Sequence, residues 1–526
     1  MKHKILLLLA LFTSTSLFAS VKPFYGFDSY KTKARGGQNV MIPSNIMSGL
    51  NPVYNAPMKI GSKNLASLSC VGSPKVPIVL VQFSNVSFSA SGDADIVDYY
   101  DKYWNGTGDG QLYKGAGSYG SVSDYFYAQS GGLFTPQFVV IGPVTLSRAY
   151  SYYGQNQGTE KDININQFYE EAIGKILELN VDLTQFDNNN DGVIDMLYFV
   201  YAGLGENEIA ADDPYTIWPK EQPIKSTIHD MDFGSFASCN ELTGNKGSGI
   251  GVMCHELSHA LGLPDFYTID YIGFGLDYWD LMDSGSYCKN GYQPCGYSAY
   301  ELSFMGWRDL ITLTAGQGCT VTIYPMTDER GRGYKIVNPA NPNEYYIIEN
   351  RKSESWDKYI GYGTPGWGYH SGLLITHVDY DATAWNKNRV NVEENHPRMT
   401  IIPADGEMIP VLSVDDVQYT LNDYLTSMNG DMYPGSLNIT SFKDEQQIVY
   451  YSEGMGQPIT NIVQNVDGSI TFDFCGGETN SIETNPILKT NQPKMVYDMN
   501  GRVVNIDRNQ FNRGIYIING KKVLVK

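Results

Sequence analysis

The feature that most constrains the fold is a pair of histidines near the middle of the chain, within the stretch GVMCHELSHALGLPDFY. His255 and His259 lie four residues apart. On an α-helix this spacing places both imidazoles on one face, where they can bind one metal ion. The competing interpretation is an ordinary buried helix with two hydrogen-bonded histidines. Because the whole chain has only seven histidines, a chance arrangement of this kind is rare, and we favour a zinc site.

Three residues around the pair complete the chemistry expected of such a site. Glu256 follows the first histidine, so its carboxylate would project beside the metal, where it can take a proton from a bound water and pass it to a leaving amine. Gly262 would allow a sharp turn out of the helix, and Asp265 would return as the third ligand. A ligand from Glu301, on a later helix, is the alternative, but it leaves Gly262 and Asp265 unexplained.

A methionine-containing turn follows the motif. Met282 lies in the stretch YWDLMDSGSY, among Gly, Ser and Asp residues. In metzincins such a turn lies beneath the zinc as a hydrophobic floor, and we expect the same role for Met282 rather than that of a plain core residue. Tyr287 comes shortly afterwards and is a candidate to stabilise an oxyanion.

A second metal is predicted from the stretch DNNNDGVID. Its residues occupy positions 1, 3, 5, 7 and 9 of an EF-hand-like loop, with Gly192 at position 6 where the chain bends. Position 12 is Tyr198 and not Glu, so the loop is truncated; an Asx-rich turn without metal is the alternative. The predicted structural calcium ligands are Asp187, Asn189, Asp191, the carbonyl of Val193, and Asp195.

Composition limits the class of protein. Hydrophobic residues make up 42% of the chain and charged residues 18%, which is typical of a globular protein. The formal net charge of −20 argues against nucleic-acid binding and is compatible with cation sites.

The first twenty residues predict export. Residues 1–20 have the features of a signal peptide: two lysines, then an apolar run, then small residues at the expected cleavage site. No other stretch is long enough for a transmembrane segment. We therefore expect a protein that is secreted or held at the outer surface. An exported protein can form disulfides. Because the chain has seven cysteines, at least one has no partner within the chain. The first disulfides that we consider are Cys288–Cys295 and Cys239–Cys254.

The sequence divides into segments that differ in composition and in predicted secondary structure. An arm or pro-segment is expected at 21–72, and its end contains Cys70, which could either keep the metal site latent or join Cys319 or Cys475 in a disulfide. Buried strands are predicted at 75–83 and 194–203, a capping box at Ser121, and an amphipathic helix at 168–179. The expected layout is a multidomain chain: an α/β metzincin-like catalytic domain at 73–312, an all-β, sandwich-like accessory domain at 313–476, a linker at 477–486, and a small C-terminal β module at 487–526.

Several quoted motifs together resemble one known family. HELSHALGLPDFY, WDLMDSG, DNNNDGVIDMLYFVYAGLGE, TIWPKE and GYSAYELSFMGW are similar to the immune inhibitor A family of secreted bacterial metallopeptidases, strongly over about residues 75–310. The resemblance implies one catalytic Zn²⁺ with Asp265 as third ligand, a Ca²⁺-stabilised catalytic domain and an accessory β domain. The C-terminal stretches VYDMNGRVV and RGIYIINGKKVLVK resemble the sorting domain of type IX secretion, which implies the secretion machinery as a partner.

The function expected from the sequence is that of a secreted zinc metalloendopeptidase. Water on a zinc held by His255, His259 and Asp265 would be activated by Glu256 and would attack a peptide bond of a protein or peptide substrate. The alternative is a surface binding or adhesion protein in which the metal domain is only a scaffold, although a scaffold has no use for Glu256. A zinc hydrolase acting on another kind of bond is a third reading.

Overall fold

The structure is a computed structural model of the chain. It describes residues 67–477, and outside that range only the strands at 32–33, 496–497, 503–504, 514–518 and 521–525. Within 67–477 the undescribed positions are 93, 159, 208–214, 225–226, 268–274, 362–370, 394–395, 409–420 and 444–447. The expected signal peptide, most of the arm and nearly all of the linker therefore lie outside the described residues.

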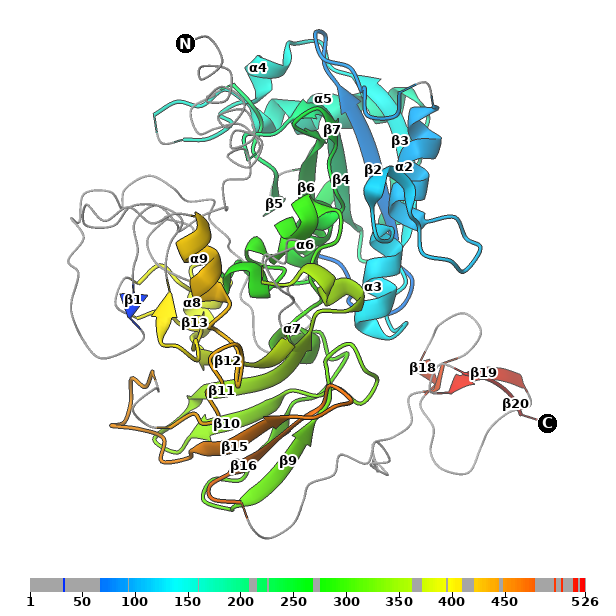
Figure 1. The fold of residues 1–526 in the computed structure, drawn as a ribbon. Helices are drawn as coiled ribbons and strands as arrows, with labels where there is room; N and C mark the ends of the chain where they lie inside the picture. The colour runs from blue at the N-terminus through cyan, green and yellow to red at the C-terminus, as the bar shows by residue number, and fades with distance from the viewer. Residues whose placement is uncertain are drawn as a thin grey trace, which may run out of the picture.

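A mixed six-stranded sheet forms the upper half of the molecule in Figure 1, in the order β3-β2-β4-β6-β5, with β7 paired to β6. The strands β2, β3, β4 and β6 run parallel, and β5 lies antiparallel at the edge. The sequence predictions of two buried strands are confirmed by β2 and β4. The bounds are β2 Lys75–Gln82, β3 Gln137–Thr145, β4 Val193–Leu204, β5 Lys220–Pro223, β6 Asp232–Thr243 and β7 Lys246–Gly247.

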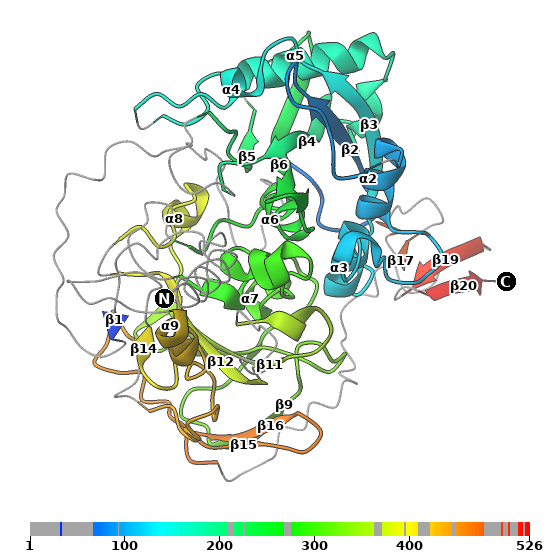
Figure 2. The same ribbon diagram turned by 45° about the horizontal axis from the view of Figure 1, so that its top comes forward.

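Helices cover both faces of this sheet. The strand β4 is an unbroken apolar run because its residues alternate between two buried clusters, with Tyr198 facing one and Phe199 the other. The helix α5 (Ile165–Glu178) packs on the Phe199 side, which confirms the predicted amphipathic helix. The helices α2 (Ile96–Asn105), α3 (Val122–Ser130) and α6 (Gly251–Ala260) pack on the other side, as Figure 2 shows. The capping box predicted at Ser121 is present at the start of α3.

The second half contains two further sheets. One has five strands in the order β13-β12-β11-β10-β8, and the other has three in the order β15-β16-β9. This region also carries two short helices, α8 (Ala382–Asn386) and α9 (Leu421–Met428). The strand bounds are β8 Ile311–Thr312, β9 Cys319–Ile323, β10 Tyr334–Asn338, β11 Asn341–Lys352, β12 Ser371–Asp379, β13 Met399–Ile401, β15 Ile459–Gln464 and β16 Ile470–Phe474.

The five-stranded sheet is buried on both faces. On β11, Tyr346 and Ile348 pack against the three-stranded sheet, whereas Tyr345 and Ile347 belong to the cluster that also contains α6. That second cluster includes residues from Leu68 to Met432. The hydrophobic core is therefore continuous across residue 312, where the sequence predicts a domain boundary.

The remaining described elements are short. The strand β1 (Thr32–Lys33), from the expected arm, pairs with β14 (Glu407–Met408). The strands β17 to β20 form a separate four-stranded sheet within the expected C-terminal module. Their bounds, with those of the other short elements, are β17 Val496–Tyr497, β18 Val503–Val504, β19 Gly514–Ile518, β20 Lys521–Val525, α4 Tyr150–Tyr153, α7 Ala299–Phe304, and the 3-10 helices Gly115–Gly117, Leu183–Phe186, Asp277–Trp279, Ser284–Gly291 and Ser355–Tyr359. Among the described residues, no helix is both long and apolar enough to span a membrane.

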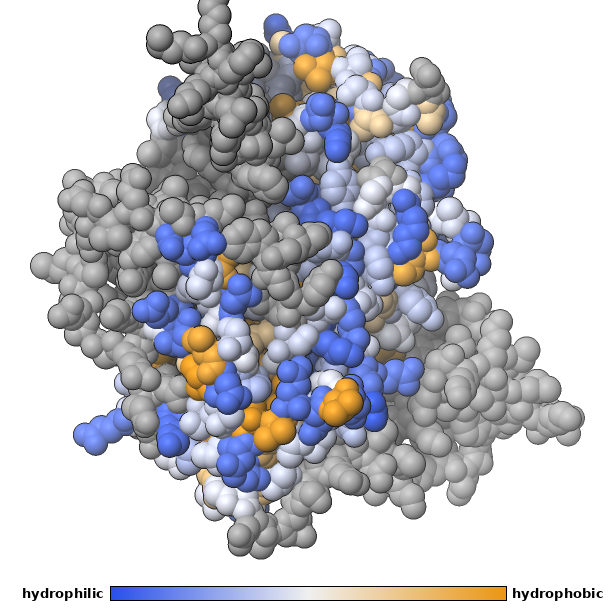
Figure 3. All heavy atoms as spheres, viewed as in Figure 1, coloured by the Kyte–Doolittle hydropathy of each residue, from blue (hydrophilic) through white to orange (hydrophobic). Residues whose placement is uncertain are grey.

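The surface seen in Figure 3 is mostly polar, with orange residues dispersed over its lower part. The exposed large hydrophobic residues of the second half include Leu437, Val463 and Val466. Single exposed apolar side chains of this kind are normal on soluble proteins.

Candidate metal centre

The helix α6 carries the two predicted histidine ligands, and both side chains are buried. His255 and His259 are each 8% exposed, and their rings lie 4.8 Å apart between centroids. Gly262, just beyond the helix, has a φ of 104°, a conformation that favours glycine. This is the turn that the sequence predicts, and it brings the chain back toward the histidines at Asp265.

The two imidazoles are oriented by backbone carbonyls. His255 Nδ1 lies 2.8 Å from the Leu281 carbonyl oxygen, and His259 Nδ1 lies 2.7 Å from that of Leu263. A hydrogen bond from Nδ1 leaves Nε2 as the nitrogen available to a metal. Both Nε2 atoms lie 3.1 Å from Asp265 Oδ1.

Asp265 completes a compact set of ligand atoms. The three groups offer atoms within 4.8 Å of one another, and they are the only such metal-ligating set among the described residues. Burial acts to raise the pKa of Asp265, but His259 and His255 lower it by more, so the net shift is downward. The carboxylate is thus held in its charged form. Glu301, the alternative third ligand, instead caps the helix α7 through Ser298.

Glu256 lies beside the ligand set and not within it. It is 6% exposed, and its Oε2 has no hydrogen-bond partner. Burial raises the pKa of Glu256 to about 8, with Asp265 and Glu221 adding to the rise and His255 opposing it. The backbone of Glu221, on the edge strand β5, also opposes the rise.

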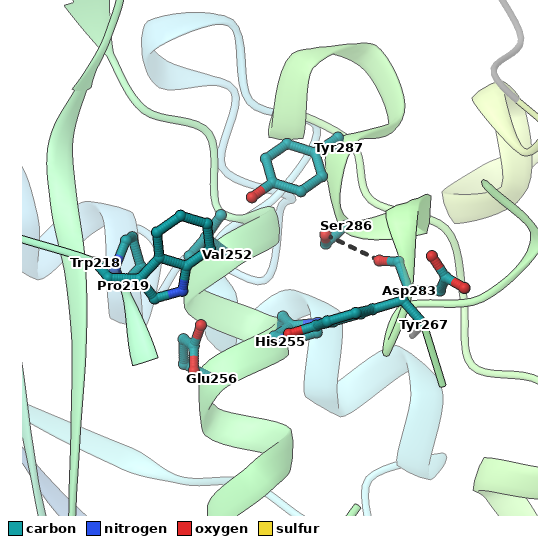
Figure 4. Close-up of a pocket in the computed structure, with 9 residues that line it drawn as sticks. All are labelled: Trp218, Pro219, Val252, His255, Glu256, Tyr267, Asp283, Ser286 and Tyr287. Carbon is teal, nitrogen blue, oxygen red and sulfur yellow. Dashed lines mark hydrogen bonds between the residues drawn. The ribbon is translucent and has the colours of Figure 1, made fainter. Parts of the chain in front are cut away.

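A pocket opens in front of His255 and Glu256, as Figure 4 shows. Tyr287 and the Trp218 indole face each other across it, above Glu256. The ring of Tyr267 stacks on His255, with centroids 6.3 Å apart. The lining residues are Trp218, Pro219, Val252, His255, Glu256, Tyr267, Asp283, Ser286 and Tyr287.

Met282 lies in a turn of the structure, and its role as a hydrophobic floor beneath the metal stays a prediction. Its side chain is fully buried, and its carbonyl accepts a hydrogen bond from Phe266 N at 2.9 Å. The preceding residue, Leu281, provides the carbonyl that orients His255. The turn therefore touches both the ligand helix and the segment that follows Asp265.

The predicted calcium loop is closed by its own hydrogen bonds. Asp187 accepts from the backbone of Asp191 at 3.1 Å and of Gly192 at 2.9 Å. The Asp195 side chain accepts from the Asn188 amide at 2.8 Å. Calcium binding by Asp187, Asn189, Asp191, Val193 and Asp195 stays a prediction.

The cysteines and the remaining described histidines are not part of this metal-ligating set. No disulfide joins any of the seven cysteines in this structure, and the Cys70 thiol donates to the Met305 carbonyl at 3.4 Å. His377 pairs with Glu344 and His396 with Asp379. These two histidines are outside the metal-ligating set; His370 lies outside the described residues.

Sequence reasoning missed one contact of the centre. Asn388, in the second half of the chain, pairs with Asp265 through both its side-chain amide and its carbonyl oxygen. No local pattern marks this residue, because its partner is 123 positions away.

Comparison with known proteins agrees with this geometry. Residues 73–308 match the family described as "Immune inhibitor A peptidase M6, catalytic domain". Over 217 residues the chain is 30% identical to the pre-pro-metalloprotease PrtV of Vibrio cholerae, covering 35% of this chain and 23% of that protein. It is 24% identical to immune inhibitor A of Bacillus thuringiensis subsp. alesti over 422 residues, covering 67% of this chain and 58% of that protein.

The chain thus spans less than two thirds of the length of these relatives. The match includes the ligand helix, the methionine turn and the whole six-stranded sheet, but not the C-terminal module. The segment 73–308 is therefore similar to the catalytic domain of the M6 metallopeptidases, as its motifs predict.

Proposed function

We propose that this protein is an exported zinc metalloendopeptidase that cleaves peptide bonds of protein substrates. The observation that carries the proposal is the convergence of His255, His259 and Asp265, with the unpartnered Glu256 carboxylate oxygen beside them. The match of the surrounding segment to a metallopeptidase family supports it.

The residues present fit zinc. Two imidazole nitrogens and one carboxylate oxygen form a typical three-ligand catalytic set, which leaves one position open. Both imidazoles have their second nitrogen on a backbone carbonyl, as metal-bound histidines usually do. When bound, Zn²⁺ supplies Lewis-acid chemistry, lowering the pKa of a coordinated water and polarising the substrate carbonyl.

The protein's own residues supply the proton transfers. Glu256 lines the pocket and its Oε2 has no hydrogen-bond partner, so the carboxylate can accept a proton from the attacking water. The same carboxyl can then deliver that proton to the departing amine. Tyr287 lines the same pocket, and its hydroxyl is the candidate donor to the developing oxyanion.

The edge strand gives a way to hold the substrate. The strand β5 pairs with β6 along one side, and no described strand pairs with its other side. An extended peptide can add there as a further strand. Trp218 and Pro219 immediately precede β5 and line the pocket, so a peptide on this edge would pass over Glu256.

Export, calcium and attachment belong to the same proposal. The signal peptide at 1–20, the calcium loop at 187–195 and the sorting-like module at 487–526 would give a secreted or surface-held enzyme that reaches its place through secretion machinery. We further propose that 73–312 is the catalytic unit and 313–476 a β-rich accessory unit.

Metal removal and restoration test the proposal. The full chain is stripped with a chelator, and hydrolysis of unfolded casein is measured before and after addition of Zn²⁺, with Mg²⁺ as control. Limited proteolysis beforehand removes any inhibition by the arm. We expect loss of activity on stripping and recovery with zinc alone. Zinc binding without cleavage in any of these samples would support the alternative of a binding protein with a metal scaffold.

A further inference from the structure

The third ligand is clamped by a residue from the second half of the chain. Asn388 Nδ2 donates to Asp265 Oδ2 at 2.5 Å, and Asp265 N donates to Asn388 Oδ1 at 2.6 Å. Both side chains are about 5% exposed, so water does not compete with these hydrogen bonds. The clamp occupies Oδ2 and leaves Oδ1, the oxygen that faces both histidines.

The backbone around Asn388 is built for this contact. The residue lies two positions beyond the end of α8 and has a φ of 53°, a left-handed conformation that asparagine tolerates better than most residues. Its N–H bonds to the Trp385 carbonyl at 3.1 Å, and Trp385 is 1% exposed. The position of the amide is thus set by a buried anchor.

A second asparagine holds the neighbouring residue. Asn391 Nδ2 donates to the Phe266 carbonyl at 2.6 Å and to the Met399 carbonyl at 2.7 Å. Asn388 therefore acts on the ligand carboxylate, whereas Asn391 acts on the backbone beside it.

We propose that Asn388 is a positioning residue of the metal centre, which fixes the rotamer of the Asp265 carboxylate and thereby sets zinc affinity. This inference rests on the proposed function. It also makes a segment beyond residue 312 part of the centre. Outer partners of metal ligands typically change metal affinity about 10–100-fold when they are removed.

Two substitutions test this role in the full chain. Asn388→Gly removes the amide while accepting the left-handed backbone. Asn388→Asp keeps the size and the acceptor for Asp265 N but replaces the donor by a second carboxylate. Asn386→Ala is the control, because Asn386 is the last residue of α8, two positions before Asn388, and its side-chain oxygen has no hydrogen-bond partner.

The measurements are zinc affinity by chelator competition, the Tm of the metal-free protein, and the visible spectrum of the Co²⁺-substituted protein, which reports ligand geometry. We expect zinc affinity to fall about 10–100-fold in both Asn388 variants, with an altered cobalt spectrum, and to stay unchanged in the control.

Zinc affinity within about twofold of wild type in a folded Asn388 variant would overturn the inference, as would a lower Tm without a change in affinity or spectrum. If the glycine variant does not fold, the aspartate variant decides. A wild-type chain that binds no zinc would instead refute the proposed function.

Discussion

Replacing Arg351 by methionine is the most informative test of how the two halves are joined. This residue of β11 is fully buried. Its guanidinium donates to Asp357 Oδ1 at 2.7 Å and Oδ2 at 3.0 Å, and to Glu349 Oε1 at 2.9 Å. It also donates to the Gly296 carbonyl at 2.8 Å. One side chain thus links β11 to the segment that leads into α7.

The expected cost follows from what the substitution leaves behind. Methionine fills similar space but leaves two buried carboxylates without their cation. Removing one partner of a buried ion pair costs about 3–5 kcal/mol, and the fourth hydrogen bond adds to that loss. At about 2–4 °C per kcal/mol for large domains, Tm should fall by about 6–20 °C.

Thermal unfolding followed by near-ultraviolet circular dichroism measures this change. The matched control is Arg330→Met, since Arg330 makes the same two-pronged contact with Asp328 at the surface, where screening makes such pairs weak. We expect the control to unfold close to the wild-type temperature. Equal Tm values for Arg351→Met and the control would refute the reasoning.

Three further changes have defined outcomes. Gly251→Ala should destabilise the chain by about 1–3 kcal/mol, because a Cβ there would overlap the Ser286 carbonyl oxygen; urea unfolding measures it, and an unchanged midpoint would contradict the packing described. Ser298→Ala should cost about 1 kcal/mol through loss of the α7 cap, measured in the same way, and no loss would show that the cap does not contribute. Burial raises the pKa of Asp405 to about 6. The folded chain therefore holds a proton that the unfolded chain has released above about pH 4, and the stability contributed by this group falls as pH rises from 4 to 6. Asp405→Asn should accordingly stabilise the protein by about 1 kcal/mol at pH 8, after allowance for partial exposure, and have little effect at pH 4; equal effects at both pH values would contradict the assignment.

The local parts of the metal centre could be predicted from sequence. The spacing of His255 and His259 places them on one helical face, and Gly262 marks the turn toward Asp265; the structure has both features. The reason is that each depends on the geometry of a single helix and its end.

The long-range parts could not be predicted. The amide of Asn388 reaches Asp265 only because the five-stranded sheet packs against the catalytic half, and a single sequence carries no signal for that packing. One clue was present in the stretch EYYIIENR. Its unbroken apolar run is typical of a strand covered on both faces, as β11 is in the structure.

The central claim is that Glu256 moves the protons at a zinc site, and one measurement tests it most directly. Initial rates of casein cleavage are compared for the full chain and for Glu256→Gln after limited proteolysis, at equal measured zinc content. We predict about one zinc per chain in both proteins and a rate at least about 100-fold lower in the variant. Equal rates at equal zinc content would contradict the account.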